Sequence, residues 1–230
     1  MEKMRIAIAK KAATQYVGHL DFGRALERAL RRAKLPVAFS EGFNPHMKIS
    51  FGPALSVGVA SYAEYVDVEL QEHVDAVDFG ERLAHQLPPG LAFVEARPVA
   101  SPASLAAALN IADYQVELVA EETPELIAKA QEALGSFLAA EQVLFTRHTP
   151  KGVKNIELKQ FLVDGPKLMR DEAKLKVGFR LRMKSTGAVK PQEVFAVLSE
   201  QYAFPSGASC FIRTGLWSDT GAAMKTAFDI

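Results

Sequence analysis

The feature that most constrains the fold of this chain is a change in hydrophobic periodicity that recurs through residues 1–100. Runs in which apolar and polar residues alternate are typical of strands, whereas apolar residues spaced three and four apart are typical of helices. The runs predict the order strand, helix, strand, strand, helix, strand, which is that of a ferredoxin-like unit. The predicted segments are Met4–Lys10, a helix between Gly18 and Pro36, Lys48–Leu55, Glu64–Leu70, Val74–Leu87 and Leu91–Val99.

The second half repeats this pattern with one additional strand pair. Its predicted segments are a strand at Asp113–Ala120, a helix at Pro124–Ala140, strands at Val143–Thr149, Ile156–Val163 and Leu175–Met183, a helix at Pro191–Tyr202 and a strand at Ser209–Trp217. We therefore predict an α+β protein of two ferredoxin-like (β-α-β-β-α-β) units in tandem, the second elaborated with an extra hairpin. The predicted domains are residues 1–100, a linker at 101–112, a second domain at 113–218 and a tail at 219–230.

The first predicted helix is amphipathic and basic. Its apolar residues form one stripe, Phe22, Leu26, Ala29, Leu30 and Ala33. At about 100° per residue, Arg24, Arg28 and Arg31 point the opposite way, with Arg32 beside them. These arginines form either an ordinary solvated face or a surface that binds phosphate, because one guanidinium group can donate two hydrogen bonds to phosphate oxygens. The residues alone leave both interpretations open.

A turn-rich loop follows the helix, with the sequence SEGFNPH at 40–46. Gly42 permits positive φ, and the following proline biases Asn44 away from the helical region. Phe43 either stacks on a base or ring of a partner or packs the loop against the core, and we favour packing. His46 and Lys48 are better candidates for contact with a partner, because the loop presents them to solvent.

The net charge is zero, but the charges are segregated along the chain. Residues 1–50 carry ten Lys and Arg against four Asp and Glu, residues 51–142 three against fifteen, and residues 143–230 fourteen against eight. In the last block, five basic residues lie on the same face of a predicted strand, namely Lys174, Lys176, Arg180, Arg182 and Lys184. By the same argument, Asp67 and Glu69 make the corresponding face of the first unit acidic.

Two interpretations of these sheet faces compete. Either the faces pack together or line one cleft with their charges paired, or the basic face binds nucleic acid, as open sheet faces can. The basic strand offers no outward aromatic ring for stacking, because Phe179 points to the core. We therefore expect any RNA contact there to be with the RNA backbone.

The sequence argues against several kinds of catalytic centre. One cysteine, Cys210, leaves no disulfide framework and no thiolate cluster, and the five histidines form no His-x-x-x-His pair. A phosphate-binding loop and a dinucleotide-binding glycine fingerprint are also missing. His19, close to Asp21, could act as a general base, but local packing at the start of the helix is the simpler interpretation. We assign no catalytic residue and expect no metal and no cofactor.

The expected location follows from the same survey. The N-terminal sequence MEKMRIAIAKK has no apolar core of a signal peptide, and the chain has no stretch of about 18 uninterrupted apolar residues. We therefore expect a cytoplasmic protein that makes no contact with membrane.

Several short motifs stand out in residues 19–70, namely HLD at 19–21, RALRRA at 28–33, LP at 35–36, EGFNPH at 41–46 and the SYAEYVDVEL run at 61–70. In these motifs the sequence closely resembles one bacterial family, the radical-SAM-linked proteins, which contain a domain of unknown function. The later KGVKNIEL and CFIRTGLW segments extend it over residues 2–218. The resemblance implies a free protein, or a domain fused behind a cobalamin-type radical SAM protein, with the chemistry left to the radical SAM partner. The architecture is also similar to that of the RNA-binding endonucleases that process CRISPR repeats, a likeness of fold only.

Three hypotheses for the function follow. The first is a non-catalytic accessory protein that binds RNA and presents it to a radical SAM enzyme. The second is a protein–protein adaptor whose same surface docks on the radical SAM partner without RNA, and the third and weakest is a metal-independent endoribonuclease that uses His19 or His46. The candidate RNA- or partner-binding residues are His19, Arg24, Arg28, Arg31, Arg32, Phe43, Asn44, His46, Lys48, Lys174, Lys176, Arg180, Arg182 and Lys184.

Overall fold

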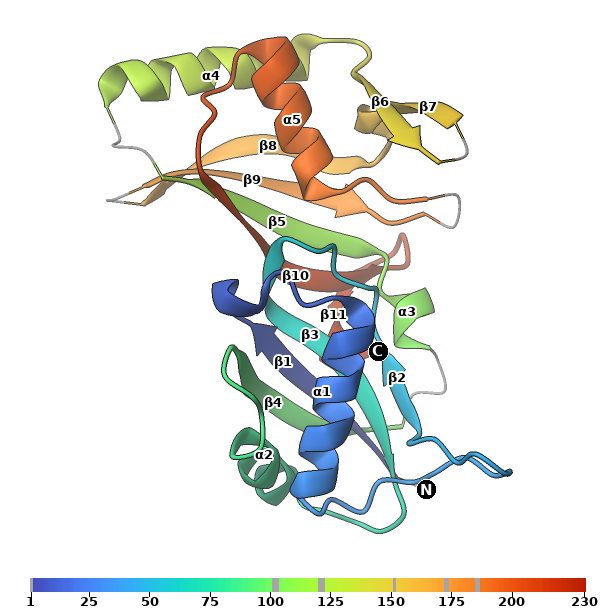
Figure 1. The fold of residues 1–230 in the computed structure, drawn as a ribbon. Coiled ribbons are helices and arrows are strands. Elements are labelled where there is room, and N and C mark those ends of the chain that lie inside the picture. The colour runs from blue at the N-terminus through green and yellow to red at the C-terminus, as the bar shows by residue number, and fades with distance from the viewer. Residues whose placement is uncertain (1, 101–103, 120–122, 151, 172–173, 185–186) are drawn as a thin grey trace. The chain divides into compact units, whose positions relative to one another are not determined.

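The structure, a computed structural model, describes residues 2–100, 104–119, 123–150, 152–171, 174–184 and 187–230 (Figure 1). It is a mixed α+β fold whose strands pair mostly in antiparallel fashion. The chain divides into two compact units. Unit 1 contains Met1–Asn110 and Arg213–Ile230, and unit 2 contains Ile111–Ile212. None of the helices described is both long enough and apolar enough to cross a bilayer.

The elements of unit 1 come from both ends of the chain. They are β1 (Glu2–Lys10), η1 (Ala12–Thr14), α1 (His19–Arg32), β2 (Ile49–Phe51), β3 (Val59–Leu70), α2 (Ala76–Ala84), β4 (Leu91–Val99), α3 (Leu105–Ala108), the larger part of β10 (Ser209–Asp219), β11 (Met224–Thr226) and η3 (Ala227–Asp229). The sheet has the order β4-β1-β3, and β3 then pairs with β2 and with β10.

Both longer helices of unit 1 cover one face of its sheet (Figure 1). The apolar stripe predicted for α1 is confirmed, because Phe22, Leu26, Ala29, Leu30 and Ala33 are all buried. They pack with alternate residues of the two central strands, Met4, Ile6 and Ile8 of β1 and Val66, Val68 and Leu70 of β3. The other face of the sheet carries the residues between them, among them Arg5, Tyr65 and Asp67.

Two strand predictions in unit 1 had wrong boundaries. The strand predicted at Lys48–Leu55 is only Ile49–Phe51, paired with Val66–Val68 of β3. It stops where the Gly52 N–H donates to the main-chain oxygen of Tyr65, at 2.9 Å, and Pro53 follows without an N–H. The strand predicted at Glu64–Leu70 begins earlier, at Val59. Sequence periodicity did not reveal this extension, because β10, from the far end of the chain, pairs with β3.

The first helix ends earlier than the proline that was expected to stop it. It ends at Arg32, and Lys34 has a positive φ of 52°. Arg82 of α2 donates to the main-chain oxygen of Ala33, from Nε at 3.1 Å and from Nη2 at 3.0 Å, and also donates to the oxygen of Lys34. A guanidinium group thus satisfies the exposed carbonyls at the C-terminal end of α1.

The segment after Ser218, predicted as a tail without a pattern, contains regular structure. Its β11 pairs with β10, with Thr226 opposite Trp217. The predicted boundary between the second domain (113–218) and the tail (219–230) therefore differs from the boundary between the two compact units, which falls within β10 after Ile212. The predicted linker at 101–112 lies partly outside the described residues, and its described part contains α3 and the start of β5.

Unit 2 contributes further strands to the nine-stranded sheet and has its own pair of helices. Its elements are β5 (Ile111–Leu118), α4 (Pro124–Ala139), β6 (Leu144–Thr149), β7 (Gly152–Glu157), η2 (Leu158–Gln160), β8 (Leu162–Asp171), β9 (Lys174–Arg182), α5 (Pro191–Tyr202) and the first residues of β10. The strand order is β10-β5-β9-β8, and β6 and β7 form a separate hairpin. Along β9 the predicted alternation is confirmed, because Leu175, Val177, Phe179 and Leu181 are buried.

Candidate nucleic-acid interface

The outward face of α1 carries the four predicted arginines, and all four are exposed. The side chains of Arg28 and Arg31 form no hydrogen bond or ion pair with any residue that the structure describes. Arg24 contacts the Asp21 carboxylate at 3.3 Å, but both side chains are 67% exposed. An ion pair this exposed contributes little free energy, so replacing Asp21 by another anion as the partner of Arg24 costs little. Arg32 instead donates to the main-chain oxygen of Gln86, which holds the end of α1 against the segment after α2.

The SEGFNPH loop is closed at its base and open at its tip. The Ser40 N–H donates to the main-chain oxygen of His46 at 2.8 Å, and the His46 N–H donates to Ser40 Oγ at 3.0 Å. Gly42 has a φ of 113°, which explains why a glycine occupies this turn. The loop projects from the end of unit 1 at which α1 ends (Figure 1).

The structure contradicts the packing role that we favoured for Phe43. Its side chain is fully exposed at the tip of the loop. The hydrogen bonds between Ser40 and His46 fix only the base of the loop, and a Cβ added at Gly42 would meet no atom within 4 Å. The tip therefore has no core to pack against. Asn44 and His46 are exposed beside Phe43, as the sequence predicted for His46.

Lys48 does not belong with the arginines of α1. On β2 its neighbour Ile49 packs into the core below the helices, so Lys48 points to the other face of the sheet. There its Nζ lies 3.5 Å from the carboxylate of Glu69. The acidic face predicted for unit 1 is thus largely neutralised within the unit, since Asp67 is also paired.

His19 packs locally, at the first position of α1. Its ring meets Phe51 of β2 edge-to-face, with the ring centroids 5.2 Å apart. Phe51 in turn contacts Phe22 of the core at 5.8 Å. Asp21, the nearby acid that suggested a general base, contacts Arg24 instead. The geometry therefore matches the simpler of the two sequence interpretations.

The basic face of β9 is paired with acids from the strands on either side of it. Glu117 of β5 lies 3.2 Å from Lys174 Nζ and 3.3 Å from Lys176 Nζ. Arg180 donates to both carboxylate oxygens of Asp113, at 2.5 and 3.0 Å, and reaches Asp164 of β8 at 3.4 Å. These contacts offset the positive charge that the sequence suggested for this face.

The pairing also shifts the titration of the groups involved. Burial tends to raise the pKa of Glu117, but hydrogen bonds from Lys174 and Lys176 outweigh this effect, so the pKa lies below its ordinary value. The hydrogen bond with Asp113 raises the pKa of Arg180. A signal for this pairing was present in the sequence, since Asp113 and Glu117 lie on one face of β5 by the period of two. The sequence did not indicate which neighbouring strand these two acids would face.

At the end of β9 the last basic residue has a different partner. Lys184 Nζ lies 4.9 Å from the centre of the Phe161 ring, a cation–π contact. Arg182 also makes contacts within the structure. The five basic residues of this segment are therefore held by their surroundings more firmly than Arg28 and Arg31 of α1.

Sequence reasoning missed the two most deeply buried charges. Arg5 of β1 is fully buried and donates to Asp67 at 2.7 and 3.0 Å. Arg213 of β10, also buried, pairs with Glu64 and donates to the main-chain oxygen of Pro53 at 3.1 Å. Arg5 appeared only as a polar position in an alternating strand, and nothing near it in sequence indicated that it would be covered. Both pairs belong to the internal framework of unit 1.

Across the described part of the chain, no cluster of three or more His, Cys, Asp or Glu residues could hold a metal ion. The arrangement is thus a mixed α+β protein in which one helix face carries two arginines, Arg28 and Arg31, without a described side-chain partner, and an exposed aromatic loop lies in the same unit.

Comparison with known proteins gives the family. Residues 3–191 match the family described as "Uncharacterized protein conserved in bacteria (DUF2344)", and the chain belongs to this family. No curated protein matches the sequence. Among solved structures, the chain is similar to one titled "Crystal Structure of an Unknown Protein from Galdieria sulphuraria", with 12% identity over 95% of this chain and 99% of that one. The TM-score is 0.28, which is too low to support an argument about fold or function.

Proposed function

We propose that unit 1 binds single-stranded RNA through the outward face of α1 and the SEGFNPH loop, as a non-catalytic accessory protein in the bacterial cytoplasm. Arg24, Arg28 and Arg31 would contact phosphates, and Phe43 would stack on a base. His46 and Asn44 would supply polar contacts beside it. Binding of this kind combines cations that follow the RNA backbone with an aromatic ring that accepts bases of any sequence.

The observation that carries the proposal is the coexistence of unpaired guanidinium groups and a fully exposed phenyl ring in one unit. An unpaired guanidinium group already has no protein partner to lose when it meets a phosphate. A phenyl ring in water, by contrast, gains free energy by covering either of its faces. Neither feature contributes to the core of unit 1, whose apolar residues lie on the opposite side of α1.

The proposal selects α1 over β9 as the contact surface. To bind phosphate, Lys174, Lys176 and Arg180 would have to leave the carboxylates of Glu117 and Asp113, so each new contact would replace an existing one. We therefore propose that β9 contributes little to RNA binding in the wild-type protein.

Two finer statements belong to the same proposal. The orders β4-β1-β3-β2 in unit 1 and β10-β5-β9-β8 in unit 2 support the view that both are ferredoxin-like, the second with the β6–β7 hairpin inserted. The motifs HLD, RALRRA and EGFNPH support a radical SAM enzyme as the partner that receives the RNA. A protein adaptor that docks on that enzyme without RNA remains the alternative that the experiment separates.

The test is the binding of a fluorescein-labelled 12-nucleotide oligouridylate, followed by anisotropy at low salt, alongside the nucleic acid that co-purifies with the protein. The double substitution Arg28→Glu/Arg31→Glu should weaken binding by about tenfold or more, since two phosphate contacts become repulsive. Lys129→Glu/Lys154→Glu, at two exposed sites in unit 2, makes the same change in net charge and should leave binding close to wild type.

Each outcome has a clear meaning. Equal losses in the two double variants would show that only net charge matters, and the assigned surface would be wrong. A wild-type protein that carries no nucleic acid and does not bind the oligonucleotide would refute RNA binding, and the adaptor hypothesis would take its place.

A further inference from the structure

Residues 227–230, which we call the covering segment, lie against the face of the unit 1 sheet that the helices leave open. Arg5 lies opposite Asp67 of β3 and Arg97 of β4, so these three residues share that face. From it, Arg5 donates to the main-chain oxygen of Ile230 at 2.9 Å and to that of Ala227. The segment is thus held to the sheet through its main chain.

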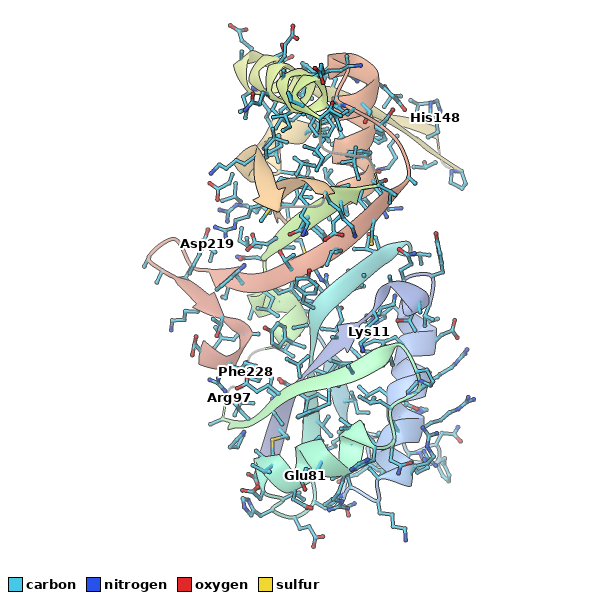
Figure 2. All side chains as sticks on the ribbon, turned by 90° about the vertical axis from the view of Figure 1, so that its left-hand side faces the viewer. Lys11, Glu81, Arg97, His148, Asp219 and Phe228 are labelled. Atoms are coloured by element: carbon cyan, nitrogen blue, oxygen red, sulfur yellow. The ribbon has the colours of Figure 1, made fainter. Side chains whose placement is uncertain are left out.

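One side chain of the covering segment occupies a cradle made by the sheet. The Phe228 ring meets Tyr65 of β3 edge-to-face, with the centroids 5.4 Å apart and an interplanar angle of 86°. The Arg97 guanidinium lies over the same ring, 4.7 Å from its centre. Figure 2 shows Phe228 beside Arg97 of β4. Arg97 Nε also donates to the carboxylate of Glu95 at 2.5 Å.

The cradle has one polar group that Phe228 cannot use. The Tyr65 hydroxyl forms no hydrogen bond with any residue in the described ranges. Burial raises the pKa of Tyr65, and the nearby carboxylates of Glu95 and Glu64 raise it further, so the hydroxyl keeps its proton near neutral pH. A planar ring with polar edges would match the cradle better than a phenyl ring does.

We propose that the Tyr65–Arg97 cradle is a binding site for a nucleobase of single-stranded RNA, and that Phe228 occupies it in place of the base. Aromatic rings and arginine guanidinium planes are the groups on which RNA-binding proteins stack unpaired bases, and a hydroxyl can bond to a base edge. This inference rests on the proposed function, because it adds a second contact to the same RNA-binding unit.

The charges around the cradle indicate what kind of contact it makes. Arg5 is paired with Asp67, Arg97 with Glu95 and Lys48 with Glu69. Because the face is internally neutral, it offers little attraction to phosphate, and the contact would be stacking of a base. The cradle and α1 lie on opposite faces of the sheet, so the two contacts act independently.

The test removes the ring that occupies the cradle. Phe228→Ala should tighten binding of the 12-nucleotide oligouridylate by about fivefold or more, within the range that one stacked base contributes. The gain should persist in the Arg28→Glu/Arg31→Glu background and should change little between about 50 and 200 mM salt, unlike the contact through α1. Adding Tyr65→Ala should abolish the gain, whereas Tyr62→Ala, at an exposed tyrosine on the same strand, should not.

A second variant guards against loss of folding. If circular dichroism shows that Phe228→Ala is unfolded, Phe228→Leu keeps an apolar side chain but removes the cation–π contact, and should tighten binding in the same direction by a smaller factor.

The outcomes separate the two proposals. If the wild type binds through Arg28 and Arg31 but the Phe228 variants bind no better, the cradle is only a structural contact and the inference is wrong. If Tyr62→Ala removes the gain as fully as Tyr65→Ala, the cradle is again not the site. If no variant binds the oligonucleotide, the proposed function itself fails.

Discussion

The outward face of α1 and the outward face of β9 look alike in sequence, since each presents a regular row of basic residues. In the structure they differ in their partners. Arg28 and Arg31 of α1 meet no acid among the described residues, whereas Glu117 and Asp113 bind three of the cations of β9. The number of cations on a surface therefore does not measure its capacity to bind an anion.

The difference arises from what lies beside each row. A helix on the surface of a sheet has solvent beside its outward residues, and only positions three or four residues away can reach them. A strand within a sheet has a neighbour on each side, and residues directly opposite lie about 5 Å apart. Asp113 lies directly opposite Arg180 in the register of β5 and β9. A basic strand is therefore more easily neutralised than a basic helix.

Neutralising the acids of β5 should make the β9 face resemble the α1 face in its capacity to bind phosphate. In Asp113→Asn/Glu117→Gln the side chains keep their size. Lys174 and Lys176 lose the carboxylate of Glu117, and Arg180 loses that of Asp113 but keeps its 3.4 Å contact with Asp164. We expect the affinity for oligouridylate at low salt to rise by about tenfold, since up to three additional cations become available for phosphate contacts. Anisotropy titrations of the double variant and the wild type measure the change.

The control for this variant is Glu132→Gln/Glu200→Gln, which removes two exposed acids of unit 2 from α4 and α5 and gives the same net charge. An equal rise in both variants would trace the effect to net charge. No rise in either would mean that pairing does not decide which surface binds, and the comparison would lose its basis.

The contrast also shows how far the sequence alone could go. Local periodicity predicted the buried stripe of α1 and the alternation along β9, because both depend on residues close together in the chain. It could not supply the partners of β9, since Asp113 lies 67 residues from Arg180. Local periodicity could not predict that β10 and the covering segment belong to unit 1 either, because they lie far along the chain from the strands that they contact.

The candidate site shows the same division. The exposure of the α1 arginines followed from the helical period, but the packing favoured for Phe43 was wrong. The loop composition revealed its turns and not the absence of a core beneath them. Arg5 and Phe228 drew no attention, because each acquires its role only when strands from the two ends of the chain meet.

The contribution of the Glu117 pairing on β9 to stability should depend on pH. The pKa of Glu117 is lowered in the folded state, so its pairing stabilises the protein above the ordinary carboxyl pKa and is lost as the pH falls through the folded value. We expect Glu117→Gln to cost up to about 1 kcal/mol near neutral pH, and less at pH 3 to 4.

Urea unfolding of the wild type and Glu117→Gln across this range measures the difference. A cost that stays constant from neutral pH down to about pH 3 would show that the carboxylate charge is not what the lysines of β9 bind.

The smallest expected effect is the change in stability when an arginine of the α1 face is removed. Arg28→Ala should change the free energy of unfolding by less than about 0.5 kcal/mol, because the side chain has no partner to lose and alanine favours the helix slightly. Arg24→Ala should behave similarly, since its exposed pair with Asp21 contributes little. Both variants should weaken RNA binding while leaving stability nearly unchanged.

Thermal unfolding and anisotropy on the same samples test this separation. A loss of more than about 1 kcal/mol in Arg28→Ala would reveal a structural role for this arginine, and the α1 face would then be no freer to bind phosphate than the β9 face.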